Sequence, residues 1–257
     1  MEPTLALTSR VDARNWQKVA DVARSKGFNA IDWNLDYFRI PAASNARSRF
    51  NRIADQAGVP SGFHGPCQDI EIGHIRPEVS EAARLYLMMY VDFLSHFKNT
   101  HMTLHMGSRS ISMDEMDWKT GCYNLRAVSS YGKSKGVTVC IENLKGGWTS
   151  DPERIIELAE YADCGITLDL GHARGSAFIR DGRYDLEGFM EVVLPRLHSL
   201  HVYDIETPEG VHVEPVTLDN IGGALRLALA NGVGWWVIEL DGLEACVRTK
   251  ELITRDL

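Results

Sequence analysis

The chain has 257 residues, of which 44% are hydrophobic and 24% charged, and its formal net charge is −8. This size and balance are typical of one globular domain with a large core. The negative charge disfavours a protein that binds nucleic acid without regard to sequence, because the surfaces of such proteins are usually basic. It leaves open a groove that is basic only locally.

The cysteine pattern and the apolar segments indicate a soluble cytoplasmic protein. The cysteines are odd in number and form no CxxC pair: Cys67, Cys122, Cys140, Cys164 and Cys246. Free thiols in a reducing compartment fit this pattern better than a disulfide framework does. The first residues do not have the pattern of a signal peptide. The most apolar segment, residues 85–97, is too short to cross a bilayer and contains Asp92, so we expect no membrane partner.

Strand-like and helix-like segments alternate along the chain. The strand candidates are apolar, β-branched runs at residues 4–8, 28–33, 59–64, 101–106, 137–143, 165–171, 197–203 and 235–240. The segments between them have helical periodicity. Ser150-Asp151-Pro152-Glu153 is a helix start signal, and Asn231-Gly232 is a helix stop signal.

Strand–helix units of about thirty residues account for the whole length. This repetition predicts a parallel sheet closed into an α/β (β/α)8 TIM barrel, with residues 1–257 forming one domain. The alternative is a doubly wound open sheet, which usually begins with a glycine-rich phosphate loop after its first strand. Here the first strand is followed by TSRVDAR, which contains no glycine.

Carboxylate and imidazole side chains stand at the carboxyl ends of consecutive strand candidates. Glu142, Asp169, His201 and Glu239 end the fifth to eighth candidates. In a barrel these ends meet at one rim, which is where the chemistry of such folds lies. Three carboxylates and one imidazole suit Mn2+, Mg2+, Co2+ or Zn2+ in an open site. We therefore expect a divalent metal ion here, although a single such carboxylate is more often a helix cap or a surface residue.

Three more histidines follow strand ends. His172 comes three residues after Asp169 in D-L-G-H, where Gly171 allows a sharp turn that directs the histidine into the pocket. His64 and His105 close the third and fourth candidates. They are candidates for a second metal ion or for substrate hydroxyls, and packing in the core is the alternative for each.

Other residues near the strand ends are candidate substrate ligands. Asn143 is placed to orient Glu142 or to bind substrate. The loop cations Lys145, Arg109 and Arg174 suit a phosphate or carboxylate. Either tryptophan near the rim, Trp33 or Trp148, could cover a sugar face. The remaining histidines are assigned to packing or the surface: His74, His96, His101 and His198.

Six short motifs, in this order along the chain, make the sequence resemble the xylose isomerase-like superfamily of TIM barrels, which includes the AP endonuclease 2 family. The motifs are H-x-P, L-H-M-G-S, I-E-N, D-L-G-H, L-H-V-Y-D and I-E-L. The superfamily contains sugar isomerases and epimerases, inosose and 3-dehydroshikimate dehydratases, and apurinic endonuclease IV. The resemblance implies that Glu142, Asp169, His201 and Glu239 bind the metal. It also implies that Glu142 and Glu239 exchange a substrate proton from opposite faces through an enediolate, while His172 binds the oxygen that becomes negative.

The chain departs from its relatives at two places. The ketose epimerases carry an arginine shortly after the seventh-strand histidine, whereas DIETPEGVHVEPV here has none, and His212 is the nearest substrate-binding candidate. The ninth metal ligand of endonuclease IV corresponds to Gly210, and its aromatic DNA wedge is missing after His64. The positions that match the other ligands are His64, His105, Glu142, Asp169, His172, His201, His212 and Glu239.

The favoured interpretation is a metal-dependent isomerase or epimerase of a small sugar, sugar phosphate or polyol ketone, acting in carbohydrate metabolism. A dehydratase of a cyclic hydroxyketone such as inosose or 3-dehydroshikimate is the alternative, with endonuclease IV-like cleavage of nucleic acid less favoured. A barrel that only binds a partner is the remaining hypothesis. The wide apolar arc of residues 85–97 predicts a homodimer contact, or else coverage by a neighbouring loop.

Overall fold

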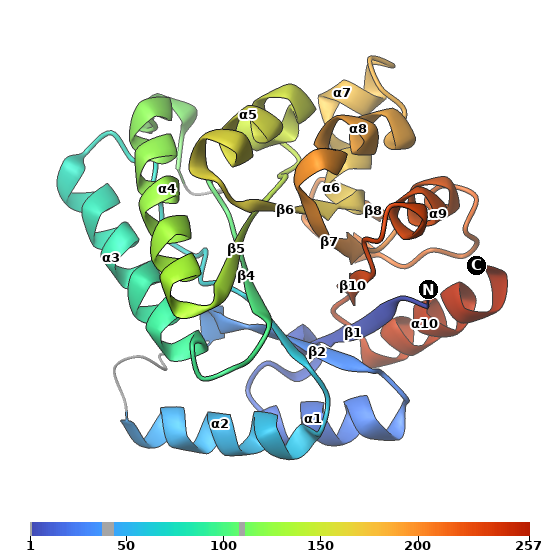
Figure 1. Ribbon diagram of the computed structural model, residues 1–257. Coiled ribbons are helices and arrows are strands. Elements are labelled where there is room, and N and C mark those ends of the chain that lie inside the picture. Colours follow the sequence, from blue (N-terminus) through green and yellow to red (C-terminus); the bar gives the residue numbers. More distant parts are fainter. Residues whose placement is uncertain (1, 38–43, 108–110) are drawn as a thin grey trace.

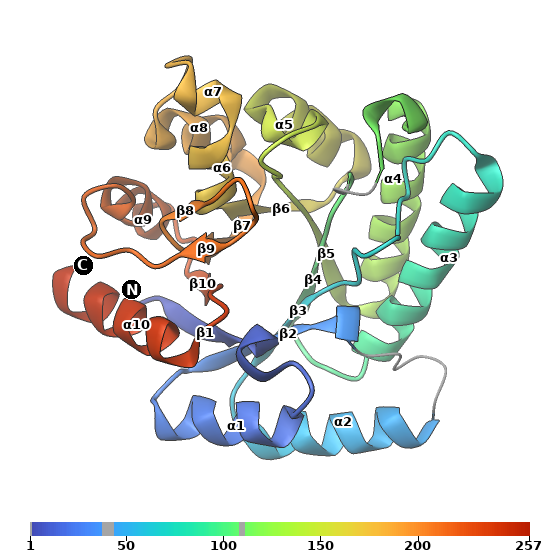
Figure 2. The same ribbon diagram turned by 180° about the vertical axis from the view of Figure 1, so that it is seen from behind.

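The computed structural model describes residues 2–37, 44–107 and 111–257. Eight parallel strands form a closed barrel in the order β1-β10-β7-β6-β5-β4-β3-β2. Figure 1 shows this ring of strands with helices around it, and the two chain ends lie side by side in both views (Figures 1 and 2). The predicted TIM barrel is therefore confirmed.

The barrel strands fall within two residues of the predicted starts. They are β1 (Thr4–Thr8), β2 (Ala30–Asn34), β3 (Ser61–His64), β4 (Thr100–Leu104), β5 (Val137–Glu142), β6 (Gly165–Asp169), β7 (Leu197–Val202) and β10 (Trp235–Ile238). The main surrounding helices are α1 (Trp16–Ser25), α2 (Ser44–Ala57), α3 (Pro77–Leu94), α4 (Trp118–Lys135), α5 (Pro152–Ala162), α8 (Leu186–Val193), α9 (Gly222–Ala230) and α10 (Leu243–Asp256).

Extra elements lie at the carboxyl ends of β6 and β7. Two short helices, α6 (Leu170–Gly175) and α7 (Ala177–Arg180), follow β6 directly. The antiparallel pair β8 (Ile205–Glu206) and β9 (His212–Val213) follows β7 and stays outside the barrel sheet. Figure 2 shows this hairpin beside α6 and β10. The hairpin brings Glu206 and His212 opposite each other in register.

The predicted helix signals work locally as expected. Asp151 caps α5 by accepting a hydrogen bond from the Glu153 backbone, and Pro152 occupies the first turn, where its missing N–H is not needed. After α9 the chain passes through Asn231 to Gly232, whose φ of 79° favours glycine. These local rules explain why the element boundaries could be read from the sequence.

The two faces of the barrel strands differ in chemistry. Outward side chains such as Ile31, Phe63 and Leu200 belong to the large apolar core between sheet and helices. A much smaller apolar cluster, built around Ala6, Ala30 and Val237, lies separate from that core. Within the barrel, hydroxyls bond across strands: Thr103 to Thr167 over 2.8 Å and Thr167 to Ser199 over 2.9 Å. The barrel interior is thus largely polar, which suits it to support a charged rim.

Two of the histidines that were assigned to packing, His101 and His198, pack at the amino-terminal end of the barrel. His101 and His198 lie near the starts of β4 and β7, with ring centroids 5.1 Å apart, and His101 also contacts the Trp235 ring at 5.0 Å. A Cβ added to Gly62 would lie 2.7 Å from His101 and 2.8 Å from both Asp32 and Trp235. Glycine is therefore required at position 62 for close packing inside the barrel.

Helix α3 accounts for most of the apolar arc from which a dimer was predicted. Leu87, Tyr90, Val91, Phe93 and Leu94 are buried against the core of the same chain. Leu85 and Met89 remain about half exposed, at 51% and 46%. The homodimer contact stays a prediction that concerns only this smaller surface.

The cysteine and membrane expectations can also be compared with the structure. All five cysteines are free thiols. Over the described ranges, no helix is long and apolar enough to cross a bilayer.

Asp32 is a carboxyl buried inside the barrel, and its charge costs folding free energy. Burial raises its pKa from 3.8 to about 6, against the opposing effect of His201 and His64. The unfolded chain therefore loses this proton at lower pH than the folded chain does, so the native state loses stability as pH rises from about 4 to 6.

We expect Asp32→Asn to stabilise the metal-free protein at pH 7.5 by up to about 3 kcal/mol, because each pKa unit corresponds to about 1.4 kcal/mol. The difference from wild type should shrink as pH falls through about 6 towards about 4. Urea unfolding of both proteins at about pH 4.5 and about pH 7.5 measures it. A constant difference at both pH values would contradict the assignment.

Candidate metal centre

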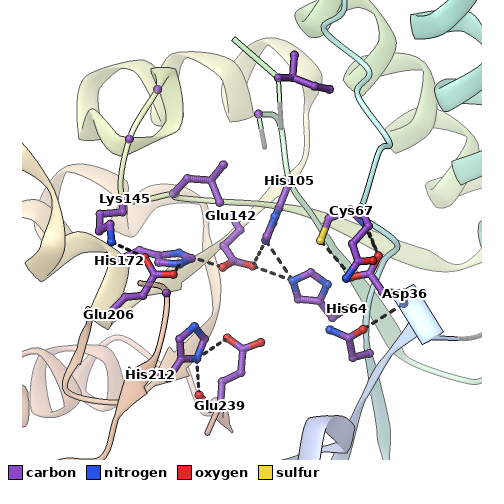
Figure 3. Close-up of a pocket in the computed structure, with 18 of the residues that line it drawn as sticks. Asp36, His64, Cys67, His105, Glu142, Lys145, His172, Glu206, His212 and Glu239 are labelled. Atoms are coloured by element: carbon purple, nitrogen blue, oxygen red, sulfur yellow. Dashed lines mark hydrogen bonds and ion pairs between the residues drawn. The ribbon is translucent and has the colours of Figure 1, made fainter. Parts of the chain in front are cut away.

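A cavity of about 760 Å³ opens at the carboxyl ends of the barrel strands. Figure 3 shows side chains from opposite sides of the ring pointing into it, with Glu142 between His105 and His64 on one side and His172 on the other. Most residues predicted for the site line this cavity: His64, His105, Glu142, Lys145, His172, His212 and Glu239.

Three further predicted residues lie behind the cavity surface. Asp169, His201 and Asn143 are buried beside the lining residues, with at most 1% of each exposed. Arg109 lies outside the described residues. The closed barrel therefore brings the lining residues and these three buried residues to one rim, because most of them stand at or just after the end of a barrel strand.

The four predicted metal ligands form one buried group. One ligand atom from each of Glu142, Asp169, His201 and Glu239 lies within 4.8 Å of the others. His201 is central: its Nδ1 is 3.1 Å from Glu239, 3.5 Å from Glu142 and 3.8 Å from Asp169. The four side chains come from β5, β6, β7 and the end of β10, so neighbouring strands of the ring place them together.

This group has the properties that a divalent cation requires. Over the ranges the structure describes, Asp169 Oδ2 and both ring nitrogens of His201 are buried without a hydrogen-bond partner. Asp169 Oδ1 is already used, because it caps α6 by accepting from the His172 N–H at 2.7 Å. Buried polar atoms without partners are costly, and a coordinated metal ion would satisfy them. The residues therefore fit a divalent ion.

The charges within the group act on one another. Burial alone would raise the pKa of Glu142 and of Glu239, but His201 and the neighbouring His105 or Arg10 hold both pKa values well below the usual range. Burial likewise opposes the charging of His201, yet Glu239 and Glu142 raise its pKa well above 6.5. Glu142 and Glu239 are therefore ionised and carry the negative charge that a cation site requires.

A second ligand group adjoins the first on the side of β3 and β4. His64 Nε2 lies 3.1 Å from His105 Nε2, and the two rings approach Glu142 Oε2 at 3.4 and 3.2 Å. His64 Nδ1 lies 2.8 Å from the Gly65 carbonyl, to which it donates when protonated. That bond leaves Nε2 facing the cavity, the arrangement usual for a metal-ligating histidine.

A third group lies on the opposite side, at the β8–β9 hairpin. His172, Glu206 and His212 each present a ligand atom within 4.8 Å of the others. Glu206 was not predicted, and it supplies a carboxylate where one was expected to be missing because of Gly210. The missing carboxylate was expected from the position two residues before His212, which is Gly210. In the structure the hairpin register instead brings Glu206, from the other strand, opposite His212.

A fourth group, Asp36 with His64 and Cys67, is explained by loop structure. Asp36 Oδ1 accepts from the backbone N–H groups of Cys67 and Gln68 at 2.8 and 3.0 Å, and the Cys67 thiol donates to Oδ2 at 3.1 Å. Burial, together with Asp36, raises the pKa of this thiol far above its usual range. A protonated thiol is a poor metal ligand, so the group fastens the loop after β3 to the end of β2.

Two predicted substrate contacts are corrected by the structure. Asn143 is buried, and its amide bonds both backbone groups of Asp169, at 2.6 and 2.9 Å, so it links β5 to β6 and is not free to bind substrate. Trp33 lies in the outer core, where it contacts Phe50, and cannot cover a sugar. The other tryptophan, Trp148, packs edge-to-face on Trp118.

Arg174 also lies away from the cavity lining. Its guanidinium group donates to the Asp204 carbonyl at 2.7 Å and forms an ion pair with the Asp204 carboxylate. Arg174 therefore fastens α6 to the loop after β7 and is not placed as a substrate anion site.

Gly171 has a different function from the one predicted. Its backbone lies in α6 without a positive φ, so a sharp turn does not require glycine. A Cβ at this position would lie 1.9 Å from Cε2 and 2.4 Å from Cζ of Tyr203. Glycine is needed because the Tyr203 ring packs directly on this backbone. The same ring stacks on His212, with centroids 3.9 Å apart and an interplanar angle of 3°.

Two further residues of the site were missed in the sequence. Arg10 follows β1 and reaches Glu239 at 3.4 Å and Asp241 at 2.8 Å. Tyr203 is fully buried, and its hydroxyl lies near enough to Asp169 for that carboxylate to raise the pKa of the phenol. A search for charged residues shortly after every strand end would have found Arg10. Tyr203 lies in the motif L-H-V-Y-D, but nothing in the sequence indicates that its ring packs on Gly171 and His212.

Comparison with known proteins shows the family to which the chain belongs. Residues 20–246 match the family described as xylose isomerase-like TIM barrel. The chain belongs to this family. An uncharacterized protein of Methanocaldococcus jannaschii is 26% identical over 193 residues, which are 75% of this chain and 78% of that protein.

Solved structures with the same fold are named for different activities. A D-tagatose 3-epimerase-like protein has a TM-score of 0.76 at 16% identity, covering 98% of this chain and 96% of the other. A xylose isomerase-like protein from Mycobacterium smegmatis in complex with magnesium has a TM-score of 0.72 at 17% identity, with coverage of 98% and 96%.

Endonuclease IV from Thermus thermophilus has a TM-score of 0.67 at 15% identity, and each chain is covered to 98%. A probable 3-DHS dehydratase from Bacillus anthracis has a TM-score of 0.72 at 12% identity, with complete coverage of both. At these identities the comparison shows the fold alone, so the reaction has to be argued from the site.

Tyr203→Phe tests whether the buried hydroxyl supports the centre. Burial and the charge of Asp169 raise the pKa of Tyr203, so the phenol stays protonated beside a carboxylate of the ligand group. We expect the substitution to weaken Mn2+ binding by about 10-fold or more, as is usual for partners of metal ligands. Titration followed by the paramagnetic resonance of free Mn2+ measures this affinity.

Tyr131→Phe is the matched control, because it removes a tyrosine hydroxyl that donates to Asp92 at 2.7 Å between α4 and α3. Tyr131 is not among the residues that line the cavity, so this variant should bind Mn2+ as the wild type does. Equal affinity in wild type and Tyr203→Phe would show that Tyr203 only packs.

Proposed function

We propose that this protein is a metal-dependent isomerase or epimerase of a small neutral sugar or polyol ketone. The observation that carries the proposal is the convergence of Glu142 and Glu239 on His201 from two different strand ends. A divalent ion held by these residues with Asp169 would polarise a carbonyl and its neighbouring hydroxyl, making the intervening C–H more acidic.

The two glutamates are suited to proton transfer on opposite faces of a substrate. Both line the cavity, and the imidazoles and Arg10 around them lower their pKa values, so both stay ionised. One carboxylate would take the proton from carbon. The other would first take a proton from the solvent that reaches the open cavity and then give it to the opposite face of the resulting enediolate, after which the first carboxyl group releases its proton to solvent. Inversion needs two such groups because one base reaches only one face of a carbon.

His172 is placed to act on the substrate oxygen where negative charge develops. Its Nδ1 lies 3.0 Å from the Asn143 carbonyl, which fixes the ring orientation, and Nε2 is directed towards Glu206. Burial opposes its protonation, but Asp169, Glu142 and Glu206 raise its pKa well above 6.5. A positioned N–H donor of this kind stabilises an oxyanion.

The charge of the cavity wall favours a neutral substrate. Among the described lining residues, the lysine and arginine side chains are Lys145 and Arg10, and each is paired with a carboxylate. A phosphate or carboxylate group would have to compete with Glu206 or Asp241 for these cations. This supports a neutral sugar over a sugar phosphate or 3-dehydroshikimate.

Cleavage of a phosphodiester is the second candidate, and a specific observation favours it. Three of the ligand groups adjoin one another, because Glu142 belongs to two of them and His172 of the third lies 3.4 Å from Glu142. Cleavage assisted by several metal ions would use all of them. Elemental analysis separates the candidates, since an epimerase with one centre requires one ion per chain and the cleavage reaction requires more.

Glu142→Gln and Glu239→Gln test the epimerase. With D-tagatose and D-fructose as neutral probes in deuterated water, we expect wild type to exchange a carbon-bound proton. Each variant should lower that rate by about 100-fold or more, since general acid–base groups contribute this much. Nuclear magnetic resonance of the sugar measures the exchange.

Metal content has to be measured in each variant, because both glutamates also belong to the ligand group. The control is Glu157→Gln, which changes an exposed glutamate paired with Arg154 on α5. Exchange that persists at the wild-type rate in both variants would exclude these carboxylates as the bases.

A further inference from the structure

The third ligand group contains two histidines whose orientations are fixed from behind. His172 Nδ1 lies 3.0 Å from the Asn143 carbonyl, and His212 Nδ1 lies 2.7 Å from the Glu239 carbonyl. Each Nδ1 therefore carries the proton it donates, and Nε2 of His172 lies 3.8 Å from Glu206 Oε1. His212 is held further by its stacking on Tyr203. The two rings and the Glu206 carboxylate thus face one common position.

Lys145 already brings a positive charge to this group. Its Nζ lies 2.9 Å from Glu206 Oε2 and donates to the Thr207 carbonyl at 2.8 Å. Its aliphatic chain passes over Gly175, where an added Cβ would lie 2.8 Å from the lysine Cδ. Figure 3 shows the ammonium group directed at Glu206 beside His172. The lysine is therefore fastened at two points and packed along its stem.

We propose that the ammonium group of Lys145 is the resident cation of the His172–Glu206–His212 group and takes the place of a metal ion there. An ammonium group 2.9 Å from the one carboxylate neutralises it and repels a divalent ion approaching the same oxygen atoms. The central group differs, since it gathers three carboxylates around His201. The cavity thus contains two kinds of group: the central group, which would bind a metal ion, and the His172–Glu206–His212 group, whose carboxylate is neutralised by Lys145.

The neutralised group is suited to bind hydroxyl groups of the substrate. On this part of the cavity wall Glu206 accepts hydrogen bonds and the ammonium group of Lys145 donates them. A neutral polyol offers both donors and acceptors to such a set. This part of the inference rests on the proposed function, whereas the exclusion of a metal ion does not.

The test is the number of Co2+ ions bound per chain, measured by equilibrium dialysis and by visible absorption. Lys145→Met removes the ammonium group but keeps an aliphatic stem over Gly175. We expect it to bind one Co2+ more than wild type, with a new absorption component. Lys145→Arg keeps the charge and should bind the wild-type number.

Two further variants identify the position of the added ion. Glu206→Gln in the Lys145→Met background should return the count to the wild-type number. Glu206→Gln alone should not lower the wild-type count, because the ammonium group already holds the cation position. A wild-type count that falls in Glu206→Gln, or an unchanged count in Lys145→Met, would overturn the proposal.

Failure of the proposed function is seen separately. Asp169→Asn should remove Co2+ from the central group of the wild-type protein. If Co2+ stays bound in Asp169→Asn, the assignment of the metal ion to the central group is wrong, whereas the Co2+ counts of the Lys145 variants still test the inference about Lys145.

Discussion

The burial of three carboxylates around one imidazole is the constraint on which the site depends. Glu142, Asp169 and Glu239 are nearly inaccessible to solvent, and like charges at such distances repel strongly unless a cation lies among them. Neighbouring groups meet this requirement in part, because Arg10 forms an ion pair with Glu239 and the His105 ring lies 3.2 Å from Glu142. A divalent ion would complete the compensation.

The barrel meets this constraint because the outer and inner faces of its strands carry different kinds of side chain. Apolar side chains are directed outwards to the helices, so the inner face is free for hydroxyls, imidazoles and carboxylates. Stability and chemistry are thereby assigned to alternate residues of the same strands. The buried charge of Asp32 shows that this arrangement has a cost in folding free energy.

Proteins that share this fold are named for different reactions, and the cavity wall is where they can differ. Among the described residues of this chain, the wall pairs Arg10 with Asp241 and Lys145 with Glu206, so these cations are neutralised. An active site that handles an anionic substrate keeps such cations available for it. The pairing on the wall therefore carries more information about the substrate than the metal ligands do.

The sequence by itself determined the barrel, the central ligand group and the histidines around it, whereas only the tertiary structure decided the contacts made by loops and packing. Glu142, Asp169, His201 and Glu239 could be found because each ends a strand, and a closed parallel barrel brings every strand end to one rim. Glu206 faces His212 through hairpin register, and Lys145 reaches Glu206 from a loop far away in the chain. Such pairings depend on how separate segments fold over one another, and no local pattern encodes that.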